Sequence, residues 1–174
     1  MYLITGYFDD TTGSILKHHI EEIAGITGNA YMTDNHIPPH MTLCMLEARD
    51  VGVLIPGFRQ FAEASRSCEV IIASVGMLFP YVMYAAPVPN EELMNMSQRL
   101  TEIYGSVADV SISRYYTTNH WMPHITLAKR LDSAQMQRAL AKMRDSFTPF
   151  IGRIVEVGLS EVNPHRDVER IRLI

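Results

Sequence analysis

Apolar residues along the chain follow two patterns, short runs typical of strands and longer stretches with helical spacing. The short runs predict strands at about 2–8, 40–46, 68–77, 81–88, 122–128, 150–160 and 167–173. The longer stretches predict helices at about 11–27, 50–66, 90–104 and 133–147. Pro56 and Gly57 can shorten or kink the second helix. Asn90 is a candidate N-cap of the third helix, and Asn163–Pro164 is a candidate turn between the last two strands.

A nine-residue segment of the chain occurs twice. Residues 35–43 read Asn-His-Ile-Pro-Pro-His-Met-Thr-Leu and residues 119–127 read Asn-His-Trp-Met-Pro-His-Ile-Thr-Leu, so six of the nine aligned positions are identical. Around each copy the predicted elements follow the same order of strand, helix, motif strand, helix and strand. An internal repeat of this kind indicates a duplicated supersecondary unit.

The repeat predicts an α+β fold with approximate twofold symmetry. We expect one domain, residues 1–174, with repeat halves at about 1–78 and 79–174. Its two pseudo-symmetric lobes should each contain a mainly antiparallel sheet with flanking helices, arranged around a central groove. No segment is long or polar enough to act as a linker that makes the lobes independent domains.

The two motif strands carry the candidate catalytic residues. Side chains alternate between the faces of a strand, so His40 and Thr42 point to one side. His124 and Thr126 do the same in the second copy. The apolar residues between and after them point to the reverse face and should anchor each strand in a core.

Two such strands facing each other would place two imidazoles and two hydroxyls around one small site. Cleavage of a phosphodiester needs a neutral imidazole to accept a proton and a protonated imidazole to deliver one to the departing oxygen. An ordinary histidine pKa of about 6.5 makes both forms accessible near neutrality. The threonine hydroxyls can donate to the phosphate oxygens, where negative charge grows in the transition state. This scheme requires neither a metal nor another cofactor.

Composition narrows the classes of partner. Apolar residues make up 47% of the chain and charged residues 20%, the balance of a globular protein. The formal net charge of -4 and the pI of about 5.9 argue against binding of long duplex nucleic acid, which needs a positive excess. A small nucleotide or an RNA end remains a suitable substrate.

Cysteine usage and the chain ends favour a cytoplasmic protein. Cys44 and Cys68 lie in apolar runs, as expected for buried free thiols in a reducing compartment. The first residues lack the basic segment of a signal peptide, and no apolar run approaches the roughly 18 to 20 residues that span a bilayer. We expect no membrane association, and a monomer as the default state.

The chain resembles the two-histidine (2H) phosphoesterase superfamily, which includes RNA 2',5'-ligase-like proteins and cyclic nucleotide phosphodiesterases. The resemblance rests on residues 39–43, Pro-His-Met-Thr-Leu, and residues 123–127, Pro-His-Ile-Thr-Leu. It implies hydrolysis or transfer at 2',3'-cyclic phosphates or 2',5'-linkages without metal. By analogy with relatives that open cyclic phosphates, His40 would be the acid and His124 the base.

Residues near the second motif are candidates for substrate binding. Members of the superfamily often carry a basic residue shortly after this motif, and Lys129 stands in a similar place with Arg130 beside it. Trp121 and Tyr115 could stack on a nucleotide base, with packing of the loop as the alternative for each. Weaker candidates are a third loop aromatic, two strand tyrosines that favour core packing, and two further arginines that favour the surface. These are Tyr116, Tyr7, Tyr84, Arg114 and Arg166.

Two other functions fit the same sequence. A binding module could hold a nucleotide or RNA end without cleaving it, although intact histidines and threonines in both motifs argue against this. A metal hydrolase could use His36 and His120, which form His-x3-His pairs with the motif histidines. A proline lies inside each pair and the second histidine begins a strand, so the spacing that places two ligands on one helix face does not apply. Loop histidines that orient the motifs are the preferred interpretation.

Overall fold

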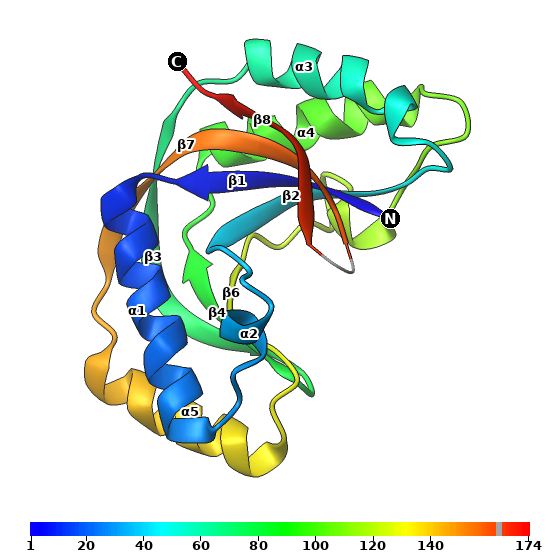
Figure 1. Ribbon diagram of the computed structural model, residues 1–174. Coiled ribbons are helices and arrows are strands. Elements are labelled where there is room, and N and C mark those ends of the chain that lie inside the picture. The colour runs from blue at the N-terminus through cyan, green and yellow to red at the C-terminus, as the bar shows by residue number, and fades with distance from the viewer. Residues whose placement is uncertain (163–164) are drawn as a thin grey trace.

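The computed structural model describes residues 1–162 and 165–174 (Figure 1). The predicted Asn163–Pro164 turn lies outside the described residues. The elements are β1 (Tyr2–Phe8), α1 (Asp10–Thr27), α2 (Tyr31–Asp34), β2 (His40–Glu47), the 3-10 helix η1 (Val51–Val53), α3 (Ile55–Glu63), β3 (Cys68–Leu78), β4 (Val82–Pro87), α4 (Glu91–Gly105), β5 (Ser111–Ile112), the 3-10 helix η2 (Arg114–Tyr116), β6 (Ile125–Ala128), α5 (Ser133–Ser146), β7 (Phe150–Glu161) and β8 (Arg166–Arg172).

The long elements confirm the predicted strands and helices, with two differences. The stretch 50–66 is divided into η1 and α3, and Pro56 lies in the first turn of α3. A proline is tolerated there because the first turn of a helix uses no backbone N–H for internal hydrogen bonds. The second motif strand is shorter than predicted, since β6 begins only at Ile125.

The helix ends follow the local sequence. The Asp9 side chain accepts a hydrogen bond from the Thr12 backbone N–H at the start of α1. Asn90 caps α4 in the same way, as predicted, through the backbone N–H of Leu93. At the start of α5, Asp132 and Gln135 form a reciprocal capping box.

All the strands join in one antiparallel sheet whose order is β1-β2-β6-β4-β3-β7-β8. The short strand β5 lies outside this path and pairs with the end of β2. The long strand β7 pairs with β3 near its start and with β1 and β8 farther along. Because β7 also pairs with β1, the path of strand pairing returns to its beginning. The motif strands β2 and β6 meet at one point of this path, where Met41 pairs with Ile125.

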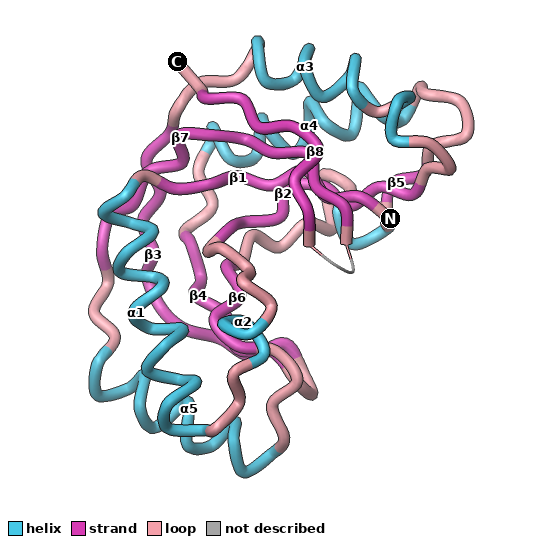
Figure 2. The backbone as a smooth tube through the Cα atoms, in the orientation of Figure 1, coloured by secondary structure: helices cyan, strands magenta, loops and turns pink. Residues whose placement is uncertain are grey.

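The packing of the helices reveals how the two repeat halves are combined. Helix α1 packs against α5 and β6, and helix α4 packs against α3 and β2 (Figures 1 and 2). The first helix of each half therefore covers the motif strand of the other half. The first strand of each half pairs with the motif strand of its own half and with the last strand of the other half: β1 pairs with β2 and β7, and β4 pairs with β6 and β3. The fold is α+β with approximate twofold symmetry, and each side of the molecule contains elements of both halves.

The core lies between the strands and these helices. Met41 and Leu43 of β2 are fully buried. Ile125 of β6 is also fully buried, and Leu127 is almost so. The apolar face predicted for each motif strand is thus the face that packs inward. No helix in the described part of the chain combines the length and apolar character needed to cross a membrane.

Both cysteines are buried and free, as predicted. Burial raises the pKa of the Cys44 thiol to about 12 and that of Cys68 to about 11. The reactive thiolate is therefore disfavoured at neutral pH.

Candidate active site

The four motif residues line a single cavity of about 250 Å³. His40 and Thr42 reach it from β2, while His124 reaches it from just before β6 and Thr126 from within β6. The rest of the lining is mainly apolar, with a few aromatic and polar side chains: Leu3, Tyr31, Met32, Asn35, Ile37, Met45, Leu78, Val82, Tyr116, Lys129, Val162 and His165. The structure thus brings together the residues that the repeat singled out.

Each motif histidine is oriented by a backbone carbonyl two residues earlier in the chain. The Nδ1 atom of His40 lies 2.8 Å from the Pro38 carbonyl oxygen, and that of His124 lies 2.9 Å from the Met122 carbonyl oxygen. A carbonyl oxygen can only accept a hydrogen bond, so Nδ1 carries the hydrogen in both rings. In both residues Nε2 is then the atom that gains or loses a proton, and the same local geometry produces this result twice.

A tyrosine lies beside each motif histidine. The ring centroids of Tyr7 and His40 are 6.4 Å apart, and those of Tyr84 and His124 are 5.7 Å apart. Tyr7 belongs to β1 and Tyr84 to β4, the first strands of the two repeat halves. The repeat therefore extends to the two strand tyrosines named from the sequence, and each lies behind its histidine and not among the residues that line the cavity.

A glycine lies beside each tyrosine ring. A Cβ atom on Gly158 of β7 would lie 2.6 Å from Cε2 of Tyr7, and one on Gly76 of β3 would lie 2.5 Å from Cζ of Tyr84. Neither distance leaves room for a methyl group. The absence of a side chain at these two positions therefore allows each ring to lie close to the neighbouring strand.

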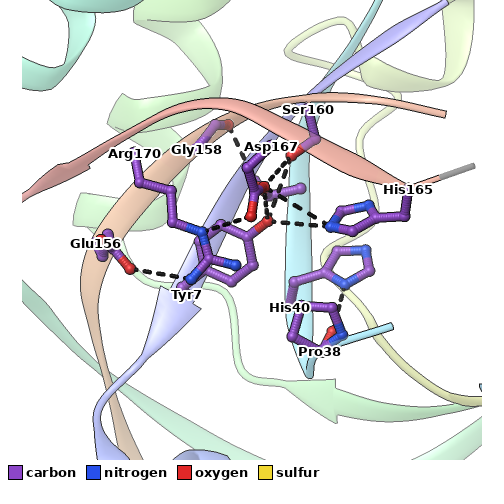
Figure 3. A network of polar contacts seen from close by, with 10 residues as sticks. Tyr7, Pro38, His40, Glu156, Gly158, Ser160, His165, Asp167 and Arg170 are labelled. Atoms are coloured by element: carbon purple, nitrogen blue, oxygen red, sulfur yellow. Dashed lines mark hydrogen bonds and ion pairs between the residues drawn. The ribbon is translucent and has the colours of Figure 1, made fainter. Parts of the chain in front are cut away.

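A network of polar contacts surrounds Tyr7 (Figure 3). The Tyr7 hydroxyl donates to Oδ1 of Asp167 at 2.7 Å, and the Ser160 hydroxyl donates to the same oxygen at 2.8 Å. The Arg170 guanidinium donates to Oδ2 of Asp167 at 2.8 Å and lies 3.7 Å from the centre of the Tyr7 ring. The Tyr7 oxygen is also 3.4 Å from Nε2 of His165. These contacts attach β8 to β1 next to the cavity.

The surroundings of His40 favour its neutral form. Burial lowers the pKa of His40 to about 4, and the neighbouring His165 and His124 act in the same direction. The Pro38 carbonyl and the Asp167 carboxylate oppose this shift. At neutral pH His40 is therefore in the form that can accept a proton and not in the form that can donate one.

The basic residues after the second motif occupy different places. Lys129 lines the cavity, as the prediction of a phosphate contact requires. Arg130 is exposed and adopts a left-handed backbone conformation, with φ of 63°. Its guanidinium lies 4.4 Å from the ring centre of Tyr31, which does line the cavity. Arg130 therefore contacts a wall residue and is not itself among the lining residues.

The aromatic residues predicted to stack on a base are placed differently from that prediction. Trp121 is buried, and its indole N–H donates to the Thr42 carbonyl oxygen at 3.0 Å. The ring therefore fixes the first motif strand and has no face on the cavity. Tyr115 is exposed, outside the lining, with the Arg114 guanidinium 4.7 Å from its ring centre. Its neighbour Tyr116 is the loop aromatic that faces the cavity.

The remaining sequence candidates lie outside the cavity lining. His36 and His120 are exposed, and Nδ1 of His120 is 3.0 Å from the Thr117 hydroxyl. Arg166 forms an ion pair with Glu161 at 2.8 Å. Within residues 1–162 and 165–174, no group of three His, Cys, Asp or Glu side chains is arranged to hold a metal ion.

Sequence reasoning missed His165 as a site residue. It lies before β8, a strand without a counterpart in the repeat, so comparison of the two halves could not reveal it. One signal was present, since His165 and Asp167 are two residues apart and would share a face of an extended chain. Tyr31 and Asn35 were also missed because the short helix α2 was not predicted.

Three comparisons connect this geometry with known proteins. The family model described as the 2'-5' RNA ligase superfamily matches residues 14–165. No curated protein matches the chain by sequence. Escherichia coli LigT, crystallised with 3'-AMP, is similar with a TM-score of 0.66 at 13% identity, over 99% of this chain and 97% of that one.

Two other crystal structures have the same fold. One, described simply as a phosphoesterase, has a TM-score of 0.68 at 15% identity, with 99% of this chain and 97% of that chain covered. The other, a protein of Thermus thermophilus, has a TM-score of 0.62 at 16% identity with the same coverage. At these identities the likeness shows a common fold.

Proposed function

Because this chain belongs to the 2'-5' RNA ligase superfamily, which implies activity of the phosphoesterase or ligase type, we propose that it is a metal-independent phosphoesterase. Its substrate would be a 2',3'-cyclic phosphate or a 2',5'-phosphodiester, at an RNA end or in a small nucleotide. The observation that carries the proposal is the cavity shared by His40 and His124, whose Nδ1 atoms are both fixed by backbone carbonyls. This leaves two Nε2 atoms for one phosphate.

The two histidines divide the proton transfers between them. Since burial favours the neutral form of His40, we assign it the role of base, which removes a proton from the attacking water or hydroxyl. His124 is then the acid that protonates the departing ribose oxygen. The oxygen–phosphorus bond forms on the His40 side as the bond to the leaving oxygen breaks on the other. This assignment is the reverse of the one implied by the family resemblance.

The other polar lining residues act on the charge of the phosphate. Thr42 and Thr126 can donate hydrogen bonds to the non-bridging oxygens, which gain charge as phosphorus becomes five-coordinate. Lys129 supplies a positive charge in the same cavity. Together they hold the phosphorus between the two imidazoles.

The size and lining of the cavity favour a small substrate. A cavity of about 250 Å³ with mainly apolar walls suits a phosphate ester joined to one sugar and base. The negative net charge disfavours long nucleic acid and agrees with a nucleotide or an RNA end as substrate, and we expect a monomer. Crystal structures of E. coli LigT hold 3'-AMP, NADP+ or phosphate, and each of these ligands contains a phosphate group.

The test is turnover of a 2',3'-cyclic nucleotide and of a 2',5'-linked dinucleotide in the presence of EDTA. We expect full activity with the chelator and loss of activity in His40→Ala and His124→Ala. The matched control is His18→Ala, because His18 is exposed on α1 and lies outside the cavity. Abolition of turnover by EDTA would point to a metal hydrolase, and tight nucleotide binding without product would point to a binding protein.

A further inference from the structure

A third histidine stands next to the proposed catalytic pair, on one side only. His165 lies before β8, lines the cavity and has a side chain that is only 13% exposed. Its ring is nearly parallel to that of His40, with the centroids 5.7 Å apart and an angle of 18° between the planes. Figure 3 shows the two rings one above the other. His124 has a tyrosine beside it but no stacked histidine among the described residues.

Tyr7 and Asp167 fix the position of the His165 ring. The Tyr7 hydroxyl uses its hydrogen to reach Asp167 at 2.7 Å, so its oxygen accepts from Nε2 of His165 at 3.4 Å. The same nitrogen lies 3.7 Å from Oδ1 of Asp167. Asp167 is itself fixed by Ser160 and Arg170. A histidine anchored in this way is a rigid surface on which another ring can rest.

We propose that His165 is a positioning residue for His40, which holds the His40 ring from its position just before β8 and makes it chemically distinct from His124. The inference deepens the proposed function and rests on it. Stacking restricts the rotation of the His40 ring, so that its Nε2 stays aimed at the phosphate. Two adjacent imidazoles also repel each other when both are protonated, which favours a neutral His40.

The charges around His40 determine the direction of this effect. His165, just before β8, disfavours a proton on His40, and Asp167 of β8 favours one. Across the cavity, His124 disfavours it as well. Tyr7 of β1 separates His40 from the Arg170 guanidinium, and Lys129 is the other cation of the cavity lining. Removal of His165 should therefore make His40 easier to protonate.

NMR titration of the histidines measures the protonation midpoint of His40 without any substrate. With isotope-labelled histidine, the midpoint of His40 protonation should rise in His165→Phe by up to about one pH unit relative to the wild type. Phenylalanine keeps a flat ring against His40 but carries no charge. His165→Ala should raise the midpoint as well and should broaden the His40 signals, because the ring loses its support. An unchanged midpoint in both variants would overturn the inference.

Kinetics separate positioning from a merely structural role. On the cleaved substrate, His165→Ala should lower kcat about tenfold and leave KM within about twofold of the wild-type value. The reason is that the His40 ring is no longer held in the orientation that the reaction needs. His165→Phe should retain most of the wild-type kcat but shift the acidic limb of the pH profile to higher pH. A drop in Tm with no change in kcat or in the limb would show that His165 only stabilises the fold. If the wild type is inactive on every diester offered, the proposed function fails, while the titration still decides how His165 acts on His40.

Discussion

The two sides of the cavity begin from the same repeat and end with different environments. On each side a motif histidine is oriented by a carbonyl two residues earlier, and a tyrosine beside it lies close to a glycine. Only the His40 side is joined by β8, which brings His165 and Asp167 against Tyr7. A nearly symmetric site can therefore give its two histidines different surroundings, because residues outside the repeat, His165 and Asp167, add their charges near His40.

The largest expected effect is the loss of either motif histidine. His40→Ala and His124→Ala should each lower kcat by about 10²- to 10⁴-fold on an ordinary diester, since each removes a proton transfer. On a nucleotide diester whose leaving group is p-nitrophenolate, which needs no proton, His124→Ala should recover most of its activity and His40→Ala should not. Recovery in the His40 variant instead would exchange the two roles.

The threonines should give a smaller loss that is similar on the two sides. Thr42→Val and Thr126→Val remove a hydroxyl but keep the shape of the side chain, so each should lower kcat by roughly 10- to 100-fold through weaker stabilisation of the phosphate oxygens. The acidic limb of the pH profile of each variant should have the same midpoint as that of the wild type. Steady-state kinetics across pH would check both points, and a loss confined to KM would show that the hydroxyls only bind the ground state.

The pH profile compares the two sides directly. Because burial lowers the pKa of His40 to about 4, this base stays neutral as the pH falls below 6.5, and it is lost only as the pH passes through about 4. The acidic limb of kcat/KM should therefore have its midpoint near pH 4, so that the rate at pH 5.5 remains within about twofold of the rate at pH 7. An acidic limb near pH 6.5 would mean that the base has an ordinary environment.

The smallest expected difference concerns the two glycines. Gly158→Ala places a methyl group against Tyr7, a buried ring fixed by Asp167 and Ser160, and should destabilise the fold by about 1–3 kcal/mol. Gly76→Ala meets the outer end of Tyr84, a partly exposed ring that can move aside, and should have less effect on stability. Thermal unfolding of both variants measures the difference, and equal losses would show that the two tyrosines are equally constrained.

Most of the fold was predictable because its signals are local. The apolar runs identified the long strands, and Asn90 identified the start of α4. The short helix α2 and the late start of β6 were missed, since segments of a few residues carry too little periodicity to recognise. Pro56 indicated that the helix expected at 50–66 would be shortened or kinked, and the segment is divided into η1 and α3.

The substrate-binding residues near the second motif were less predictable than the motif itself. For Trp121 the sequence left base stacking and packing of the loop as alternatives, and the structure shows packing, with the indole buried and donating to the Thr42 carbonyl. Lys129 and Arg130 are adjacent in sequence, but only Lys129 lines the cavity. Whether a loop side chain faces the core or the cavity depends on the path of the backbone, and that path has no periodic signature.

The sequence by itself determined the duplicated His-x-Thr-Leu motifs, the histidine and threonine pairs of the candidate site and the apolar faces that anchor them, because strand alternation and an internal repeat are properties of neighbouring residues. The tertiary structure decided that each half covers the motif strand of the other, and that β8 delivers His165 and Asp167 to the His40 side alone. These contacts join residues that lie far apart along the chain. Their effect on burial and charge exists only once the chain has folded.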